Sequence, residues 1–360
     1  MIQSEFGPKE AQAVAEIIRL AKAVVQENRL PTDADGEPRL ALRDQHPKSH
    51  GCVGAELIVE DVPNELRHGV FKEPNRYPAW IRFSNGAGRI QSDATPDIRG
   101  MAIKVMGVEG EKILEEEKQA RTQDFIAINS EAFFLKDIQD VLALSKTVTT
   151  IDKIPPIPLL ETPLKLLTFV LLFARSHRTQ VEILSKAREQ AVFNPLSIQY
   201  WSGTPYKLGP HEIKFTLKPR GIESSAENSE IDKSSDNFLR EAMVEHLKEN
   251  EAGFDFLVQL RSEPQNMPLE DATIQWHSEY QKVATIKIHK QVFDTPKRRD
   301  FDENLSFDIW RSLPEHEPLA KINKLRRLVY EETSKLRHQL NNKLRQEPLE
   351  EEYYQIFGEM

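Results

Sequence analysis

Residues 325–337 read Leu-Arg-Arg-Leu-Val-Tyr-Glu-Glu-Thr-Ser-Lys-Leu-Arg and belong to a long C-terminal segment with helical periodicity. At about 100° per residue, Arg326, Tyr330 and Arg337 project within roughly 40° of one another on such a helix. Two guanidiniums therefore flank one phenol on a single face. The plain interpretation is a core tyrosine with arginines packed over it. A functional role for this tyrosine needs support from the rest of the chain.

The other interpretation is a tyrosine held as phenolate. A phenol loses its proton near pH 10, so a phenolate at pH 7 needs about 4 kcal/mol of stabilisation, at about 1.36 kcal/mol per pKa unit. A cation one helical turn away, such as Arg326, and a metal on the oxygen of Tyr330 supply such stabilisation. An iron porphyrin bound through tyrosinate is the chemistry that requires this arrangement.

The composition is that of an ordinary globular protein of 360 residues, with 39% hydrophobic residues and room for a large core. Its 48 basic and 57 acidic residues give a net charge of −9, and the basic residues are not gathered into a stripe, so nucleic acid is not expected as a partner. Cys52 is the single cysteine, which excludes disulfides and thiolate metal clusters and fits a reducing cytoplasm. The first residues show no secretion signal, so we expect a cytoplasmic protein.

The hydrophobic pattern predicts an α+β fold in which most strands are antiparallel. Alternating runs bounded by turn residues predict seven strands: 52–59, 79–83, 101–105, 124–128, 212–217, 254–260 and 283–289. Helical periodicity predicts helices at 9–28, 135–148, 160–192, 236–250 and 319–345. Few helices separate the early strands, which indicates an antiparallel sheet or barrel and not a doubly wound parallel sheet.

The most apolar segment, Leu164–Ala174, is too short to span a bilayer and contains Lys165, so we expect no stable membrane insertion. A buried helix is the first interpretation of this segment. An interfacial patch or an apolar gate for substrate is the alternative.

Polar residues that suit chemistry gather in four clusters, each next to a predicted strand. The clusters are 43–55, 82–88, 96–104 and 128–137. His46 and His50 in the first cluster suggest a metal pair, but no further ligand lies at suitable spacing nearby. Taken singly, each cluster also has a structural explanation as ion pairs, turns or core.

Together and in this order, the clusters and the C-terminal helix resemble the catalase superfamily. The matching positions are Arg43, His46, Lys48, Gly51 and Gly54; Arg82-Phe83-Ser84; Asp97, Arg99, Gly100, Ala102 and Lys104; Asn129, Phe133, Phe134 and Asp137; and Arg326, Tyr330, Thr333 and Arg337. The length is more similar to the short catalase-related haem peroxidases than to full-length catalases. The resemblance implies one catalase-like antiparallel β-barrel domain over residues 1–360, with an N-terminal helix and loop (1–38), a haem core (39–345) and a C-terminal tail (346–360).

The resemblance also implies haem b as cofactor and a role for each matched residue. Tyr330 is the expected iron ligand, with Arg326 holding it as phenolate. His46 is the expected distal acid/base, oriented by Ser84, with Asn129 hydrogen-bonding the peroxide. The remaining roles are those of cofactor contacts: Arg43, Arg82 and Arg337 on the haem propionates, and Phe134 over the macrocycle.

Several departures and alternatives accompany the resemblance. Glu131, Glu331 and Glu332 replace residues of the family pattern, and His50 is an extra histidine that competes with His46 for the distal role. Thiolate ligation through Cys52 would imply monooxygenase chemistry, but the loop that precedes such a ligand is missing, so a small buried residue is expected.

The implied activity is a peroxidase that uses hydrogen peroxide or organic hydroperoxides to oxidise small organic donors, with some catalase activity. The alternatives are a fatty-acid hydroperoxide isomerase similar to allene oxide synthases and a haem-binding protein without turnover. A homo-oligomer is compatible with the resemblance.

Overall fold

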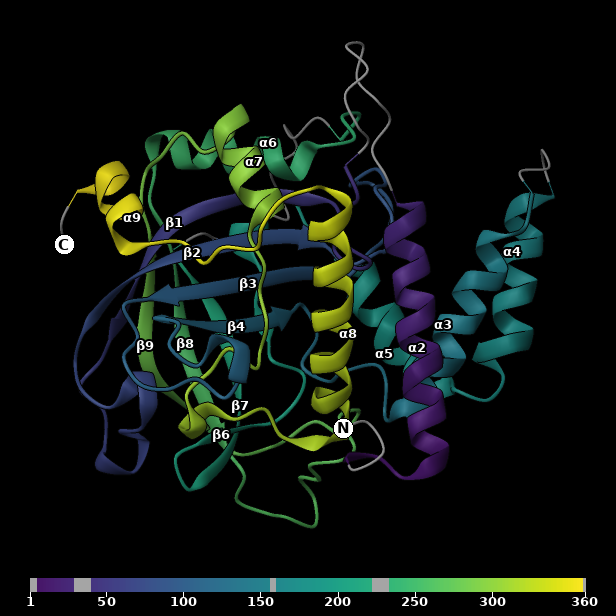
Figure 1. Cartoon of the computed structure of the whole chain (residues 1–360), viewed down its shortest axis with the longest axis horizontal. Helices are drawn as coiled ribbons and strands as arrows, with labels where there is room; N and C mark the ends of the chain where they lie inside the picture. The colour runs from purple at the N-terminus through teal and green to yellow at the C-terminus, as the bar shows by residue number, and fades with distance from the viewer. Residues whose placement is uncertain (1–4, 29–39, 156–159, 222–232, 359–360) are drawn as a thin grey trace.

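The computed structural model describes residues 5–28, 40–155, 160–221 and 233–358 (Figure 1). The α-helices are α2 (Pro8–Glu27), α3 (Ile138–Asp152), α4 (Glu161–Phe169), α5 (Arg178–Glu189), α6 (Phe238–Glu249), α7 (Pro296–Asn304), α8 (Ala320–Leu340) and α9 (Glu350–Phe357), and a π-helical turn, η4 (Val170–Ala174), continues α4. The strands are β1 (Ser49–Val59), β2 (Arg76–Asn85), β3 (Arg99–Met106), β4 (Thr122–Ile128), β5 (Tyr200–Trp201), β6 (Tyr206–Leu208), β7 (His211–Arg220), β8 (Ala252–Leu260) and β9 (Tyr280–Ile288). Short 3-10 turns are η1 (Asn64–Leu66), η2 (Gly69–Phe71), η3 (Glu115–Glu117), η5 (Pro195–Ser197) and η6 (Pro314–His316).

Eight antiparallel strands close into a barrel. The order β5-β4-β3-β2-β1-β9-β8-β7 returns to β5 through the pairs Tyr200↔Leu217 and Trp201↔Thr216, and β6 adds to β7. Closure leaves no free edge in the ring, and the inward residues form one apolar core that includes Phe215, Phe254 and Phe256. The predicted α+β class with an antiparallel barrel and flanking helices is confirmed.

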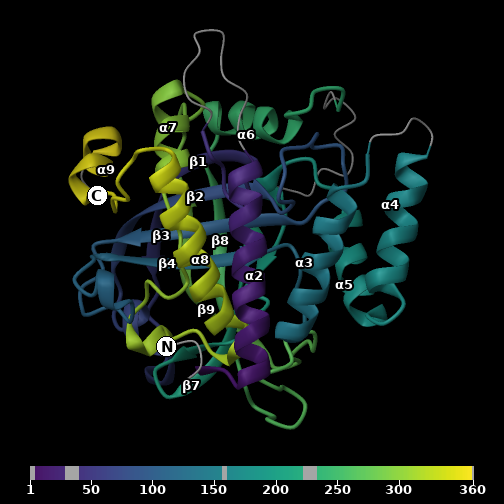
Figure 2. The same cartoon turned by 45° about the vertical axis from the view of Figure 1, so that its right-hand side comes forward.

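A layer of helices covers one side of the barrel. Helix α8 contacts α2, which in turn contacts α3, and both views place α8 in front of strands β2, β3 and β4 (Figures 1 and 2). The apolar residues Val14 and Ile17 of α2 pack with Leu325 and Leu328 of α8, so α2 holds α8 from the side. Helices α6 and α7 both contact β1.

Three sequence-based expectations differ from the structure. Burial is the first interpretation of Leu164–Ala174, yet all five of its leucines are exposed, so that interpretation is wrong and the alternative of an exposed apolar surface stands. The predicted helix 160–192 is divided by a turn after η4. The expected tail contains α9, whose Tyr353 is fully buried and packs edge-on against Trp80 at 5.4 Å.

The loop predicted after the first helix falls in residues 29–39, outside the described residues. None of the helices in the described part of the chain is both long and apolar enough to cross a membrane.

Candidate functional site

The register of three barrel strands places His46 over Ser84 and Gly100. Ser84 of β2 pairs with Ser49 of β1 on one side and with Gly100 of β3 on the other. His46 lies three residues before β1 with a left-handed backbone (φ 56°), which turns its ring onto this end of the strands. Its Nδ1 lies 2.9 Å from Oγ of Ser84, the serine that the resemblance implies as its partner.

The surroundings of His46 determine its charge. Its Nδ1 lies within hydrogen-bond distance of Ser84 Oγ, and the Asn85 backbone also hydrogen-bonds the ring. Burial, and then the charges of Arg43 and Arg326, lower the pKa of His46 to about 4, so the ring is a neutral base at pH 7.

On α8, Arg326 and Tyr330 meet one turn apart, as the helical spacing predicted. Arg326 donates from Nε to Tyr330 Oη at 3.0 Å, and its Nη1 donates to Asn323 Oδ1 at 3.1 Å and to Thr204 Oγ1 at 3.3 Å. Burial opposes the charge of Arg326, but Tyr330 and Tyr206 beside it raise its pKa above the ordinary value. A permanent cation therefore faces the phenol oxygen.

The three arginines expected at haem carboxylates gather around α7. Arg82 Nε lies 2.5 Å from Asp302 Oδ1, and Glu303 lies 3.2 Å from Arg43 Nη1 and 3.3 Å from Arg337 Nη1. Burial, followed by Arg43, lowers the pKa of Arg337 to about 10. The sequence analysis missed Asp302 and Glu303, because a run of charged residues on a short helix is typical of a solvated surface.

The arginine cluster retains donors for a further carboxylate. Arg337 uses Nη1 for Glu303, and within the described residues its Nε and Nη2 donate to no protein acceptor. Arg337 is 3% exposed, so these donors are enclosed by protein. Planar, bidentate guanidinium donors suit carboxylates such as haem propionates.

His46 and Arg326 lie close enough to influence each other. Both side chains are only partly buried. Because the charge of Arg326 also lowers the pKa of His46, the two side chains lie within electrostatic range of each other.

Asn129 and Phe134 lie after β4, but Asn129 is engaged by protein. Its Oδ1 accepts from the Arg99 backbone at 2.7 Å, and its Nδ2 donates to Ala187 O at 2.8 Å and Gln190 Oε1 at 2.9 Å. Asn129 must release one of these partners before it can bind a peroxide, so its role stays a prediction. Phe134 is half-buried, with its ring centroid 5.0 Å from that of Phe133.

The two alternatives to this site have different surroundings. His50 is 1% exposed, its Nε2 lies 2.8 Å from Asn85 Oδ1, and burial lowers its pKa to about 3. It is therefore enclosed, whereas His46 keeps an accessible ring. Cys52 is fully buried beside Trp80, and burial raises the pKa of its thiol, which disfavours a thiolate ligand.

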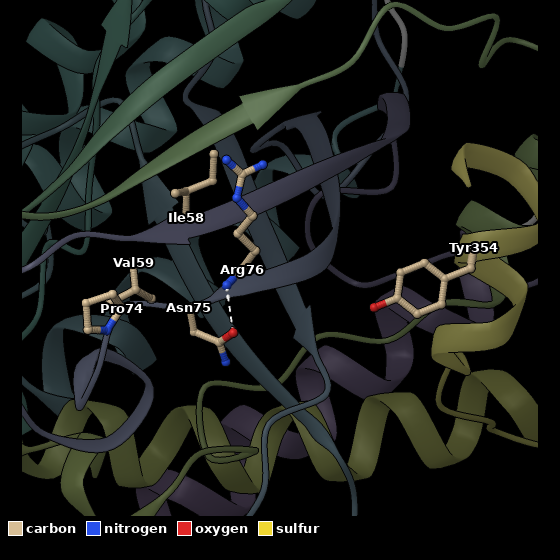
Figure 3. A pocket seen from close by; sticks show the side chains of 6 residues that line it. All are labelled: Ile58, Val59, Pro74, Asn75, Arg76 and Tyr354. Atoms are coloured by element: carbon tan, nitrogen blue, oxygen red, sulfur yellow. Dashed lines mark hydrogen bonds between the residues drawn. The ribbon is translucent and has the colours of Figure 1, made fainter. Parts of the chain in front are cut away.

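A shallow hollow elsewhere on the surface does not overlap this site (Figure 3). It is lined by Ile58, Val59, Pro74, Asn75, Arg76 and Tyr354. Ile58 pairs with Arg76 at the opposite end of β1 and β2 from the Ser49↔Ser84 pair, about 30 Å away at about 3.3 Å per residue. This hollow contains no cluster suited to acid/base chemistry.

Comparison with solved structures identifies the fold. A fungal catalase aligns with a TM-score of 0.65 at 18% identity, covering 83% of this chain and 59% of that chain. Catalase A from Saccharomyces cerevisiae aligns at 0.66 and 19%, covering 85% and 64%, and a bacterial catalase at 0.65 and 16%, covering 86% and 61%. The chain thus has the catalase fold and spans about three fifths of the length of these catalases.

No family model and no curated protein matches the sequence.

Proposed function

We propose that this chain, which has the catalase fold, is a haem-dependent oxidoreductase that acts on peroxides, with residues 39–345 as its haem core. The observation that supports this most is a pair of groups within electrostatic range of each other. His46, held by Ser84 at the end of the barrel strands, lies near Arg326, which donates to Tyr330 Oη on α8. A single cysteine is in keeping with a reducing compartment such as the cytoplasm.

The side chains gathered at this site suit haem b in this proposal. Tyr330 would ligate the iron, Arg43, Arg82 and Arg337 would hold the propionates, and Phe134 would pack on the macrocycle. The chemistry that haem supplies when bound through tyrosinate is cleavage of a peroxide O–O bond.

The chain's own residues perform the proton chemistry in this proposal. His46 Nε2 accepts a proton from the incoming hydroperoxide and returns it to the departing oxygen. Ser84 holds the imidazole through Nδ1, which would leave Nε2 toward the substrate. Arg326, which donates to Tyr330 Oη at 3.0 Å, would hold this oxygen in place as the iron ligand.

Two variants test this proposal, with haemin supplied during expression. Tyr330→Phe is expected to lose haem and peroxide turnover together. His46→Ala is expected to keep haem and lose about 10²–10⁴ of its turnover. Tyr77→Phe, on the first part of β2, is the matched control for removal of a phenol oxygen.

Haem content, the absorption spectrum and resonance Raman tyrosinate bands are measured together with hydrogen peroxide consumption. A Tyr330→Phe protein with unchanged spectra and turnover would refute the assignment of Tyr330 as the iron ligand. Full loss of activity in His50→Ala, with His46→Ala active, would transfer the distal role to His50.

A fatty-acid hydroperoxide isomerase is a second candidate, because exposed leucines of α4 and η4 lie on the helices that follow Phe134 in the chain. Product analysis with a lipid hydroperoxide separates the two activities. A peroxidase yields the alcohol and consumes a small organic donor, whereas an isomerase yields an allene oxide and needs no donor. A haem-binding protein without turnover would show no rate above free haemin.

A further inference from the structure

Helix α4 and the turn η4 carry a dense group of exposed apolar side chains. Leu166 is 62% exposed, and Leu167 and Leu171 are each 53% exposed. The other exposed members are Leu160, Leu164, Val170 and Leu172. We call these seven residues the leucine patch; a contiguous exposed apolar surface of this kind on a folded protein marks an interaction site.

The leucine patch lies at the periphery of the fold. Helix α4 contacts α3, and both views place it at the outer edge of the molecule, away from the barrel (Figures 1 and 2). From Glu161 to Ala174 the helical segment is about 20 Å long at about 1.5 Å per residue. It is therefore long enough to lie on a surface and too short to cross a bilayer.

Basic groups stand at both ends of the leucine patch. Residues 162–181 contain Lys165, Arg175 and Arg178 and no acidic residue, in a chain whose net charge is −9. Arg175 and Arg178 are exposed, and neither has a carboxylate within ion-pair distance in the described part of the chain. Lys153, at the other end of the hairpin formed by α3 and α4, is exposed as well.

Two acidic residues near the leucine patch are paired. Asp152 pairs with Arg89 at 2.9 Å, and Glu161 pairs with Lys165 at 2.6 Å. Glu182, four residues after Arg178, is exposed, so residues 160–182 contain three basic and two acidic side chains. The charge beside the apolar surface is thus slightly positive.

We propose that the leucine patch docks on the surface of a bilayer that contains anionic phospholipids. The leucines enter the boundary between headgroups and acyl chains, while Arg175, Arg178 and Lys153 meet lipid phosphates at the two ends of the helix. Apolar burial and attraction to anionic lipid are the two contributions that hold interfacial helices. This attachment is independent of the proposed peroxide chemistry and needs no haem.

The test is co-sedimentation of the full chain with vesicles of phosphatidylcholine alone or mixed equally with phosphatidylglycerol. Wild-type protein is expected to bind the mixed vesicles and to be weakened by salt. Leu167→Glu combined with Leu171→Glu should weaken binding about tenfold or more, because two apolar contacts are replaced by charges. Arg175→Gln and Arg178→Gln should each cost about fivefold on mixed vesicles and little on phosphatidylcholine.

The matched control is Val292→Glu combined with Leu344→Glu, two isolated apolar residues that are 76% and 84% exposed. It should bind vesicles as the wild type does. Circular dichroism confirms that each variant is folded, and the arginine variants test the proposal without altering the apolar surface.

Three results would overturn the proposal: no binding of wild type to mixed vesicles, equal loss in the control, or a lipid-free dimer that Leu167→Glu with Leu171→Glu converts to monomer. The last would make a second copy the occupant. Peroxide turnover is measured separately, so failure here leaves the proposed function standing.

Discussion

Gly100 controls the position of His46, and a single methyl group added there is expected to disable the site. Its ideal Cβ would lie 2.7 Å from His46 Cε1, 2.8 Å from Nδ1 and 3.0 Å from Ser84 Oγ. Ordinary contact begins near 3.4 Å, so Gly100→Ala must displace the imidazole by about 0.7 Å.

The imidazole cannot make this movement freely. Ser84 holds Nδ1 at 2.9 Å, and the left-handed backbone of His46 fixes the direction from which the ring enters. Weakening the hydrogen bond costs about 1 kcal/mol, and misplacing a catalytic group by about 1 Å costs about a hundredfold in rate. We therefore expect turnover per bound haem to fall about ten- to a hundredfold in Gly100→Ala, with haem content unchanged.

The assay is initial-rate peroxide consumption, normalised to haem measured as its pyridine complex. Gly7→Ala is the control, because Gly7 has φ −61° and no atom within 4 Å of an added Cβ. Normal turnover in Gly100→Ala would refute the argument that catalysis depends on the placement of His46. Loss of haem in the same variant would show that Gly100 acts on cofactor binding.

Two further predictions concern charge. Asp302→Asn leaves the buried Arg82 without its paired carboxylate, so the free energy of unfolding of the haem-free protein, measured with denaturant, should fall by about 3 kcal/mol. The control Asp61→Asn, at the exposed pair with Arg67, should lower it by less than about 1 kcal/mol. His46, followed by NMR without haem, should titrate near pH 4. Because this folded pKa lies below the ordinary 6.5, the stability contributed by the neutral ring is lost as pH falls from 6.5 to 4, and titration near 6.5 would contradict the site geometry.

Local patterns in the sequence predict the parts of this protein that depend on near neighbours. All seven predicted strands are present, since alternating burial is a local signal. The pairing of Arg326 with Tyr330 follows from their four-residue spacing on α8. The departures Glu331 and Glu332 prove peripheral, as they pair with Lys335 at 2.5 Å and with Lys22 at 2.7 Å.

Features that depend on distant parts of the chain escape such analysis. The pair Arg82–Asp302 joins residues 220 positions apart. They meet because β9, which precedes α7, pairs with β1 next to β2. Strand β5 has two residues, too few for a periodic signal, yet it completes the ring. The leucines of α4 were expected to be buried, because composition reveals an apolar face and not whether another element covers it.

The two halves of the candidate site differ in how they are held, and this determines where substitutions act. Ser84 and Gly100 belong to neighbouring strands of a closed barrel, whose register cannot slip without turning side chains to the wrong face, and His46 lies just before β1 beside them. The positions of Arg326 and Tyr330 depend on the placement of the single helix α8. Asn323 of this helix helps to fix that placement by donating to the Pro205 carbonyl at 3.1 Å. Changes at Ser84 or Gly100 should therefore act on the position of His46, while changes that move α8 should affect the tyrosine and Arg337 together, since both lie on the same helix.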